Sequence, residues 1–383
     1  MTLYTCRARQ NSDMSSAFLS SSRVLLADGA FHRARVEIRD GRIRSVTALG
    51  ADEKVTTEHL IVPGFVDLQV NGIDDVDIWK AASDDDQQAW DRLGNLLLDQ
   101  GVTSWCPTLV TAPLKRYRTA MDSIRRWKAS SNFAPNIIGI HLEGPFLGSA
   151  HGAHRSEFIC DPDLSWLETN LDDVVLVTMG AESRASIEAC ALATSLSTNV
   201  AIGHSRPTRK QFEDMVASGA TLVTHLFNAM SGLHHREPGL AAWALLEPKL
   251  CASIIADGVH VSSELVGLSF SAKAGGMVLV TDSVAWRSGI AGEIKMSVSD
   301  GAARLADGTL AGSTVTMPDA IKFCVYQADV PLPLALQAAT VTPSRLLRLS
   351  DRGVIMSGCR ADITELTDDL DVAAVWVSGQ QVR

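Results

Sequence analysis

Eight apolar segments recur along the middle of the chain, and most of them are separated by stretches long enough to form a helix. Between residues 65 and 283 the segments read FVDLQVN, TSWCPTL, IIGIHLE, VVLVTMG, NVAIGHS, TLVTHLF, CASIIAD and MVLVTDS. Amphipathic stretches such as QQAWDRLGNLLLDQG and RKQFEDMVASGA lie between them. Continuous apolar strands that alternate with amphipathic helices are typical of a buried parallel sheet. Eight such units predict an α/β fold, a (β/α)8 TIM-like barrel.

Both ends of the chain show a different pattern, in which short strands alternate with turns. SRVLLADG, ARVEIRDGRI and HLIVPG near the N-terminus resemble DRGVIMSGCRADITELT and VAAVWVSGQQV near the C-terminus in this respect. Neither end has enough strands to be stable alone, so we expect the two to pair. We predict a disordered, Ser-rich extension (1–16), a small β-sandwich domain (17–62 plus 351–383) and a catalytic barrel domain (63–350).

Composition excludes several classes of partner. The formal net charge is −10, and no cluster of Lys and Arg offsets it locally, so nucleic acid is not expected to bind. No run reaches the ~18 apolar residues of a membrane span, and the N-terminus lacks the apolar core of a secretion signal. The seven cysteines have no CxxC spacing and predict reduced thiols. We therefore expect a cytoplasmic protein that does not bind membranes.

Several of the predicted strands end in a side chain that can bind a metal ion or exchange a proton. Glu143 ends IIGIHLE, His204 lies in NVAIGHS, and His225 lies in TLVTHLF. Asp282 lies in MVLVTDS, and His260 follows CASIIAD. The C-terminal ends of barrel strands open on one face, where the active sites of this fold lie. We therefore expect these side chains to converge.

Two imidazoles and a carboxylate would hold a divalent ion and leave a fourth position open, which is typical of a catalytic site. We predict Glu143, His204 and His225 as these ligands; the ion would activate a water and polarise a carbonyl. Asp282 would act as the general base toward this water and then as the general acid toward the departing amine. Its alternative role is the N-cap of a helix. The pattern predicts a metal-dependent amide hydrolase.

Short motifs extend this interpretation over nearly the whole chain. They are VPGFVDLQVNG (62–72), HLEGPFL (141–147), GAHRSEFI (152–159), GHS (203–205), THLFNAMSGLHHREPG (224–239), ADGVH (256–260), VTD (280–282), LAGSTVTM (310–317) and ATVTPSRLL (339–347). Their order and spacing resemble the N-acetylglucosamine-6-phosphate deacetylases of the amidohydrolase superfamily. The resemblance implies hydrolysis of N-acetyl-D-glucosamine 6-phosphate to D-glucosamine 6-phosphate and acetate. It also implies the same three metal ligands and the same catalytic aspartate.

The resemblance further implies the contacts with substrate. His154 would polarise the acetyl carbonyl, and Arg236 would bind the phosphate, for which a guanidinium is suited. The other implied contacts are Ala153, Asn228, the backbone at Ala229, Asp257, His260, Leu310, Ala311 and Gly312. The family is commonly dimeric, with this arginine reaching into the neighbouring subunit's site, so a homodimer is implied.

The first barrel strand bears on the number of metal ions. Many relatives have His-x-His after this strand and hold a second ion there, whereas this chain has Gln69 and Asn71. Amides are poor ligands for zinc, so we predict one divalent ion per subunit, with both amides hydrogen-bonding near the site. Two His and a carboxylate suit Zn, Fe, Mn or Co, and zinc is our default.

The segment after Asp282 does not determine which substrate the protein acts on. It reads SVAWRSGIAGE, where the family usually has a small Ala- and Gly-rich loop. Trp286 would either narrow the sugar pocket or pack the loop, so N-acetylgalactosamine 6-phosphate is an alternative substrate. An amidohydrolase of N-acyl or cyclic amides is a second alternative, but a neutral substrate would leave Arg236 idle. A non-catalytic sugar-phosphate binding protein is a third, against which the complete ligand set argues.

Overall fold

The computed structural model describes residues 17–130, 135–292, 294–299 and 301–383. The predicted extension, 1–16, lies outside the described residues. Eight parallel strands follow one another around a barrel, and each coincides with one of the predicted apolar segments. They are β5 (Phe65–Val70), β8 (Val102–Val110), β10 (Ile140–Glu143), β11 (Val174–Met179), β12 (Asn199–Ile202), β13 (Leu222–Val223), β14 (Cys251–Ile254) and β15 (Met277–Leu279). The predicted (β/α)8 fold is confirmed.

The barrel closes where the first strand meets the segment that follows the last one. Val70 and Ser283 form a parallel bridge. The Asp282 N–H donates to the Gln69 carbonyl at 2.9 Å, and the Asn71 N–H donates to the Ser283 carbonyl at 2.8 Å. This closure brings the ends of β5 and β15 together, although about 210 residues separate them in the sequence.

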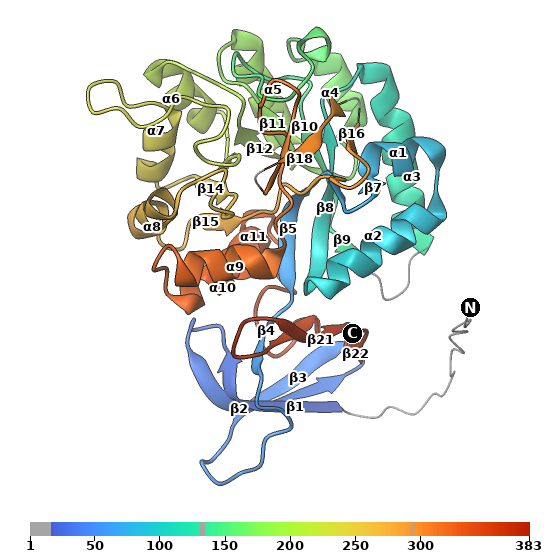
Figure 1. Ribbon diagram of the computed structural model, residues 1–383, viewed down its shortest axis with the longest axis vertical. Helices are drawn as coiled ribbons and strands as arrows, with labels where there is room; N and C mark the ends of the chain where they lie inside the picture. Colours follow the sequence, from blue (N-terminus) through green and yellow to red (C-terminus); the bar gives the residue numbers. More distant parts are fainter. Residues whose placement is uncertain (1–16, 131–134, 293, 300) are drawn as a thin grey trace.

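Helices surround the barrel, as Figure 1 shows. They are α1 (Ile78–Asp84), α2 (Gln87–Asp99), α3 (Leu114–Ser130), α4 (Leu164–Asn170), α5 (Arg184–Ser195), α6 (Arg209–Ala217), α7 (Leu240–Leu246), α8 (Ser263–Ala272), α9 (Met317–Tyr326), α10 (Leu332–Ala339) and α11 (Val341–Leu346). Local sequence sets their starts: Thr208 and Gln211 form a capping box on α6, which satisfies backbone N–H groups that the first turn leaves free. No helix among the described residues is long and apolar enough to span a membrane.

The two chain ends form a separate sheet, which lies below the barrel in Figure 1. Its strands run in the order β22-β21-β20-β4-β1-β2-β3. Their bounds are β1 (Ala17–Leu25), β2 (Phe31–Arg39), β3 (Arg42–Ala48), β4 (Leu60–Pro63), β20 (Ile363–Leu366), β21 (Val372–Val377) and β22 (Gln380–Gln381). β20 pairs antiparallel with β4, and β4 pairs in parallel with β1. The expected pairing of the two ends is therefore confirmed.

A set of buried polar side chains crosses the barrel interior below its mouth. His141 lies at the centre: its Nδ1 is 3.1 Å from the Leu68 carbonyl, and its Nε2 is 2.9 Å from Thr178 Oγ1. Thr178 Oγ1 also contacts Thr224 Oγ1 at 2.8 Å. Nearby, Thr281 Oγ1 donates to Asp67 Oδ2 at 2.6 Å. We call His141, Thr178, Thr224, Asp67 and Thr281 the inner polar set.

Two hairpins between β15 and α9 were not expected from the sequence. They are β16 (Ile290–Ala291) with β17 (Ile294–Lys295), and β18 (Ser297–Ser299) with β19 (Ala302–Arg304). Ala291, Ile294 and Met296 pack with Val284 in one apolar cluster. Trp286 is partly buried against the same cluster. The hairpins thus cover part of the barrel mouth.

Candidate metal centre and active site

The predicted functional residues lie at the C-terminal ends of the barrel strands. Glu143 is the last residue of β10, His204 and His225 each lie two residues beyond a strand, and Asp282 lies three beyond β15. The backbone of His204, His225 and Asp282 is left-handed, with φ of 49°, 32° and 48°. Such conformations cost free energy in residues other than glycine and are concentrated at functional sites.

One cavity of about 240 Å³ brings most of the predicted site together. The predicted residues in its wall are Asn71, Glu143, Ala153, His154, His204, His225, Asn228, Ala229, His260, Asp282, Leu310, Ala311 and Gly312. The wall also contains residues that the sequence did not suggest: Val110, Gly152, Ile255, Val284, Ala291, Ile294 and Thr309. Ala291 and Ile294 belong to the first unexpected hairpin, so that hairpin shapes the cavity.

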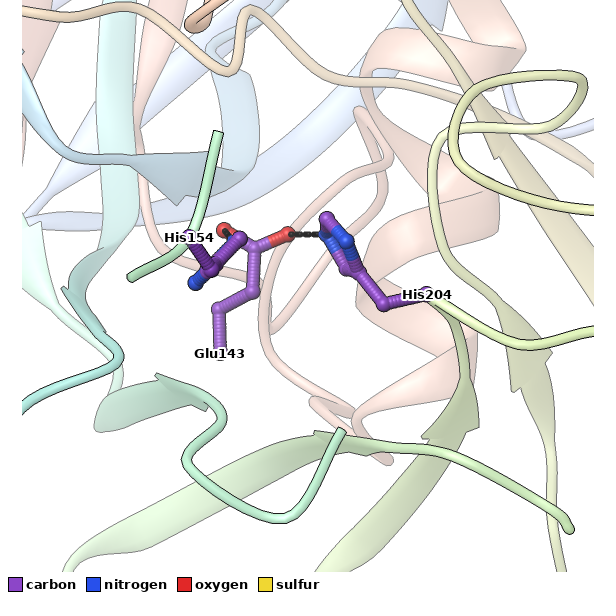
Figure 2. Close-up of side chains that lie close together, drawn as sticks. All are labelled: Glu143, His154 and His204. Carbon is purple, nitrogen blue, oxygen red and sulfur yellow. Dashed lines mark hydrogen bonds and ion pairs between the residues drawn. The ribbon is translucent and has the colours of Figure 1, made fainter. Parts of the chain in front are cut away.

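Three potential ligand atoms converge at the base of this cavity. Glu143 Oε1 lies 3.0 Å from His225 Nε2 and 3.3 Å from His204 Nε2, and the two nitrogens are 3.1 Å apart. Figure 2 shows the contact between Glu143 and His204. A tetrahedral ion with bonds of about 2.0 to 2.1 Å separates its ligand atoms by about 3.3 Å. The three side chains therefore fit a divalent ion.

The orientation of His204 supports this role. Its Nδ1 is 3.1 Å from the Ala150 carbonyl oxygen, so Nδ1 carries the proton of the neutral ring. Nε2 is then left with a lone pair that faces Glu143 and His225. A metal-binding histidine is typically held by such a bond from its other nitrogen.

His154 is a fourth candidate ligand in the same cluster. Ligand atoms of Glu143, His154 and His204 lie within 4.8 Å of one another, and Figure 2 shows the three side chains together. However, His154 Nε2 is 3.9 Å from Glu143 Oε2, farther than the nearest atom of His225 lies from Glu143. Burial, and then the neighbouring His204, lower the pKa of His154 to about 3. A neutral His154 beside the three converging atoms suits a contact with substrate.

Asp282 is held by the two amides of the first strand. Gln69 Nε2 donates to Asp282 Oδ1 at 3.0 Å and to Glu143 Oε1 at 2.9 Å. Asn71 Nδ2 donates to the same Asp282 oxygen at 2.6 Å. Both amides thus engage Oδ1 and leave Oδ2 for other partners.

Burial and charge control protonation in this cluster. Burial, and then the charge of Glu143, raise the pKa of Asp282 to about 8. For Glu143, burial alone would raise the pKa, but the interactions with His204 and His225 outweigh it and hold the pKa well below its usual range. A bound cation would oppose the shift at Asp282. At the same pH, Asp282 therefore holds a proton more readily than Glu143 does.

Other predicted residues lie outside the cavity wall. Gln69 is buried behind it. Asp257 Oδ2 lies 2.7 Å from His260 Nδ1, so this carboxylate orients the histidine that lines the cavity. Arg236 is exposed. Trp286 also lies outside the wall and packs the loop, which was one of its two expected roles.

Sequence reasoning did not single out Thr111 or Glu182. Thr111 directly follows β8, and its Oγ1 lies 2.8 Å from His154 Nδ1. Glu182 follows β11 by three residues and accepts hydrogen bonds from the loops beside His204. Both are polar residues just beyond a predicted strand, which is the same signal that identified Asp282.

Comparisons with known proteins agree with this geometry. The model of the amidohydrolase family matches residues 60–382. N-acetylglucosamine-6-phosphate deacetylase of Bos taurus is 34% identical, over 94% of this chain and 93% of the bovine protein. N-acetylgalactosamine-6-phosphate deacetylase of Escherichia coli O157:H7 is 28% identical, over 94% and 98% of the two chains.

Solved structures give the same result. A mutant N-acetyl-D-glucosamine-6-phosphate deacetylase from Mycobacterium smegmatis, in complex with N-acetyl-D-glucosamine-6-phosphate, has a TM-score of 0.88 and 30% identity, covering 96% of this chain and 99% of the other. The N-acetylglucosamine-6-phosphate deacetylase of Thermotoga maritima has a TM-score of 0.88 and 28% identity, with the same coverage. This chain therefore belongs to the amidohydrolase family and, within it, to the N-acetylglucosamine-6-phosphate deacetylases.

Proposed function

We propose that this protein hydrolyses the amide bond of N-acetyl-D-glucosamine 6-phosphate and releases D-glucosamine 6-phosphate and acetate. One observation carries the proposal: Glu143, His204, His225 and Asp282, from four different barrel strands, line one cavity. Their chemistry matches amide hydrolysis, and the named relatives supply the substrate class.

Glu143, His204 and His225 are the proposed ligands of one divalent ion, and zinc is the proposed ion. Such an ion, when bound, polarises a carbonyl and lowers the pKa of water toward ~7. Gln69 and Asn71 stand at the positions where the resemblance implies a second pair of metal ligands in many relatives. In this chain both side chains donate amide protons to carboxylates. Metal analysis that finds two tightly bound ions per chain would contradict a single site.

Asp282 is the proposed proton carrier. Its Oδ1 accepts from Gln69 and Asn71, so Oδ2 takes the proton from the attacking water. As the carbon–nitrogen bond breaks, Oδ2 gives this proton to the departing amine. The burial that raises the pKa of Asp282 favours the protonated state that the second step needs.

His154 is the proposed donor to the acetyl oxygen. A neutral imidazole can donate from Nε2 only if Nδ1 carries no proton, and a hydrogen bond donated to Nδ1 favours that tautomer. Thr111 Oγ1, 2.8 Å from Nδ1, can supply that bond. His260 faces the same cavity, and Asp257 fixes its ring through Nδ1, so its Nε2 is available to accept from a sugar hydroxyl. The remaining proposed substrate contacts are Ala153, Asn228, Ala229, Leu310, Ala311 and Gly312.

Arg236 is the proposed phosphate ligand, and it would act in a homodimer. The side chain is exposed and lies outside the wall of its own chain's cavity. Reaching the site of a second copy would explain both facts. Arg236→Ala should raise the KM for the phosphorylated sugar by about 10- to 100-fold, the loss expected for a charge-assisted contact of 1.5 to 3 kcal/mol. An unchanged KM, or a protein that sediments as a monomer while fully active, would refute this role.

The decisive experiment measures acetate release from three compounds, with and without a chelator. They are N-acetylglucosamine 6-phosphate, its galactosamine epimer and unphosphorylated N-acetylglucosamine. We expect the first to be the best substrate and chelation to abolish its hydrolysis. A faster reaction with the epimer would favour the second candidate, which the relative from Escherichia coli supports. No acetate from any of the three would overturn the proposed activity.

A further inference from the structure

Glu182 joins three loops at the mouth of the barrel. Its Oε1 accepts from the Ser149 N–H at 2.9 Å, from Ser149 Oγ at 3.0 Å and from the Arg206 N–H at 2.7 Å. Its Oε2 accepts from the Ala181 N–H at 2.9 Å and from Ser205 Oγ at 2.7 Å. These donors lie beyond β10, β11 and β12, so a single carboxylate connects the ends of three neighbouring strands.

The donors surround one proposed metal ligand. Ser205 and Arg206 directly follow His204 in the sequence. Ser149 directly precedes Ala150, whose carbonyl oxygen lies 3.1 Å from His204 Nδ1. The Ala150 N–H also donates to the His204 carbonyl at 3.3 Å. Glu182 therefore holds both the backbone that carries the imidazole and the acceptor that sets its tautomer.

Neighbouring residues are adapted to this carboxylate. A Cβ atom at position 148 would overlap Glu182 Oε2, so Gly148 lets the carboxylate approach the loop. Gln211, in the capping box of α6, donates from Nε2 to the Glu182 backbone carbonyl. Hydrogen bonds thus hold both the backbone and the side chain of Glu182 in place. An incidental contact at the surface would not need both.

We infer that Glu182 is a positioning residue that holds His204 in the geometry needed to bind the metal ion. The inference rests on the proposed function, in which His204 is a ligand. Removing a partner that orients a metal-binding histidine typically weakens metal affinity 10- to 100-fold. Glu182 acts one step farther away, through the backbone and the Ala150 carbonyl, so we expect the lower end of that range.

The test measures zinc affinity rather than activity. Metal-free protein is titrated with Zn²⁺ in competition with a chromophoric chelator, for wild type, Glu182→Gln and His204→Asn. Glu182→Gln keeps the shape of the side chain but turns an amide donor toward at least one of the N–H or O–H donors. We expect zinc affinity to fall about tenfold in Glu182→Gln and further in His204→Asn.

Asp362 provides a matched control. This buried carboxylate accepts from Arg360 Nε at 2.7 Å and from the Ser378 N–H at 2.8 Å, beside the sheet of the chain ends. Asp362→Asn should lower the thermal stability of the metal-free protein and leave zinc affinity unchanged. If Glu182→Gln does not fold, Ser205→Ala serves instead, because it removes one hydroxyl donor to Glu182 and should still weaken zinc binding measurably.

The outcomes separate the two claims. If His204→Asn binds zinc as wild type does, the ligand assignment fails and the inference falls with it. If His204→Asn loses affinity while folded Glu182→Gln keeps it, the proposed function stands and only the positioning role is overturned. Loss of affinity in both variants, with Asp362→Asn unchanged, supports the inference.

Discussion

Two groups of buried polar residues lie in the same barrel, yet they differ in how completely they are paired. Across the part of the chain that the structure describes, the mouth contains Asn71 Oδ1, His225 Nδ1 and Ser283 Oγ as buried atoms without a hydrogen-bond partner. The inner polar set contains none. Unpaired buried polar atoms are costly, and two of these three belong to Asn71 and His225, which line the cavity of the proposed site. The inner set, by contrast, is complete within the chain.

Two aspartates make the contrast specific. Asp282 at the mouth and Asp67 in the inner set are both buried, and burial raises the pKa of each, to about 8 and about 6. Asp67 accepts from the backbone N–H groups of Gln69 and Thr281 as well as from the Thr281 hydroxyl. Asp282 keeps one oxygen available. The two aspartates are similarly buried but differently paired. The difference in pairing predicts different consequences when each is replaced by asparagine.

The largest effect is expected for Asp282→Asn. The amide cannot carry a proton between water and amine, so turnover should fall by about 10²- to 10⁴-fold. Metal content should remain close to that of wild type, because the three proposed ligands are intact. Steady-state acetate release and metal analysis on the same preparation check this. Turnover within a factor of two of wild type would remove Asp282 from the mechanism.

A smaller effect, on stability instead of turnover, is expected for Asp67→Asn. Folded Asp67 holds its proton up to a pH of about 6, whereas the unfolded chain releases it near 3.8. The free energy of unfolding of wild type therefore falls as pH rises through this window, and above it the loss is about 3 kcal/mol. Asparagine can keep the bonds to Gln69 and Thr281 and avoids the charge.

Denaturant unfolding of metal-free wild type and Asp67→Asn at pH 4 and pH 8 measures this difference. The variant should gain stability relative to wild type at pH 8 and show little difference at pH 4. If the free energy of unfolding changed with pH in the same way for both proteins, ionisation of Asp67 would not destabilise the fold. The contrast between the inner polar set and the mouth would then be smaller than their hydrogen bonding indicates.

The smallest effect is expected for Thr111→Val, beside His154 at the mouth of the barrel. Valine keeps the shape but cannot hydrogen-bond His154 Nδ1, so the proposed Nε2–H tautomer is no longer favoured. We expect kcat to fall about tenfold, equivalent to about 1.4 kcal/mol. Metal affinity should not change, which distinguishes Thr111 from the proposed role of Glu182. A wild-type kcat would show that the His154 tautomer does not depend on this hydroxyl.

Local sequence predicted the barrel because its signal is periodic and repeated. Each of the eight strands has its own apolar segment, and the proposed metal ligands follow from residue type at strand ends. Thr111 was missed because its partner, His154, is 43 residues away and only folding brings the two together. The hairpins β16–β19 were missed because an apolar cluster that includes Val284 and Ala311 stabilises them, rather than any strong local pattern. Arg236 needs a second chain to complete its proposed contact.

The interleaved order of the terminal sheet affects how the protein is made. β4 ends at Pro63, and its neighbour β20 begins at Ile363, 300 residues later. At about 5 to 20 residues per second, a ribosome needs roughly 15 to 60 s to deliver that neighbour. During this time one edge of β4 has no partner strand, and such edges invite pairing with other chains. The edge of β4 that β20 covers therefore stays open to other chains for most of the time that the barrel takes to be made.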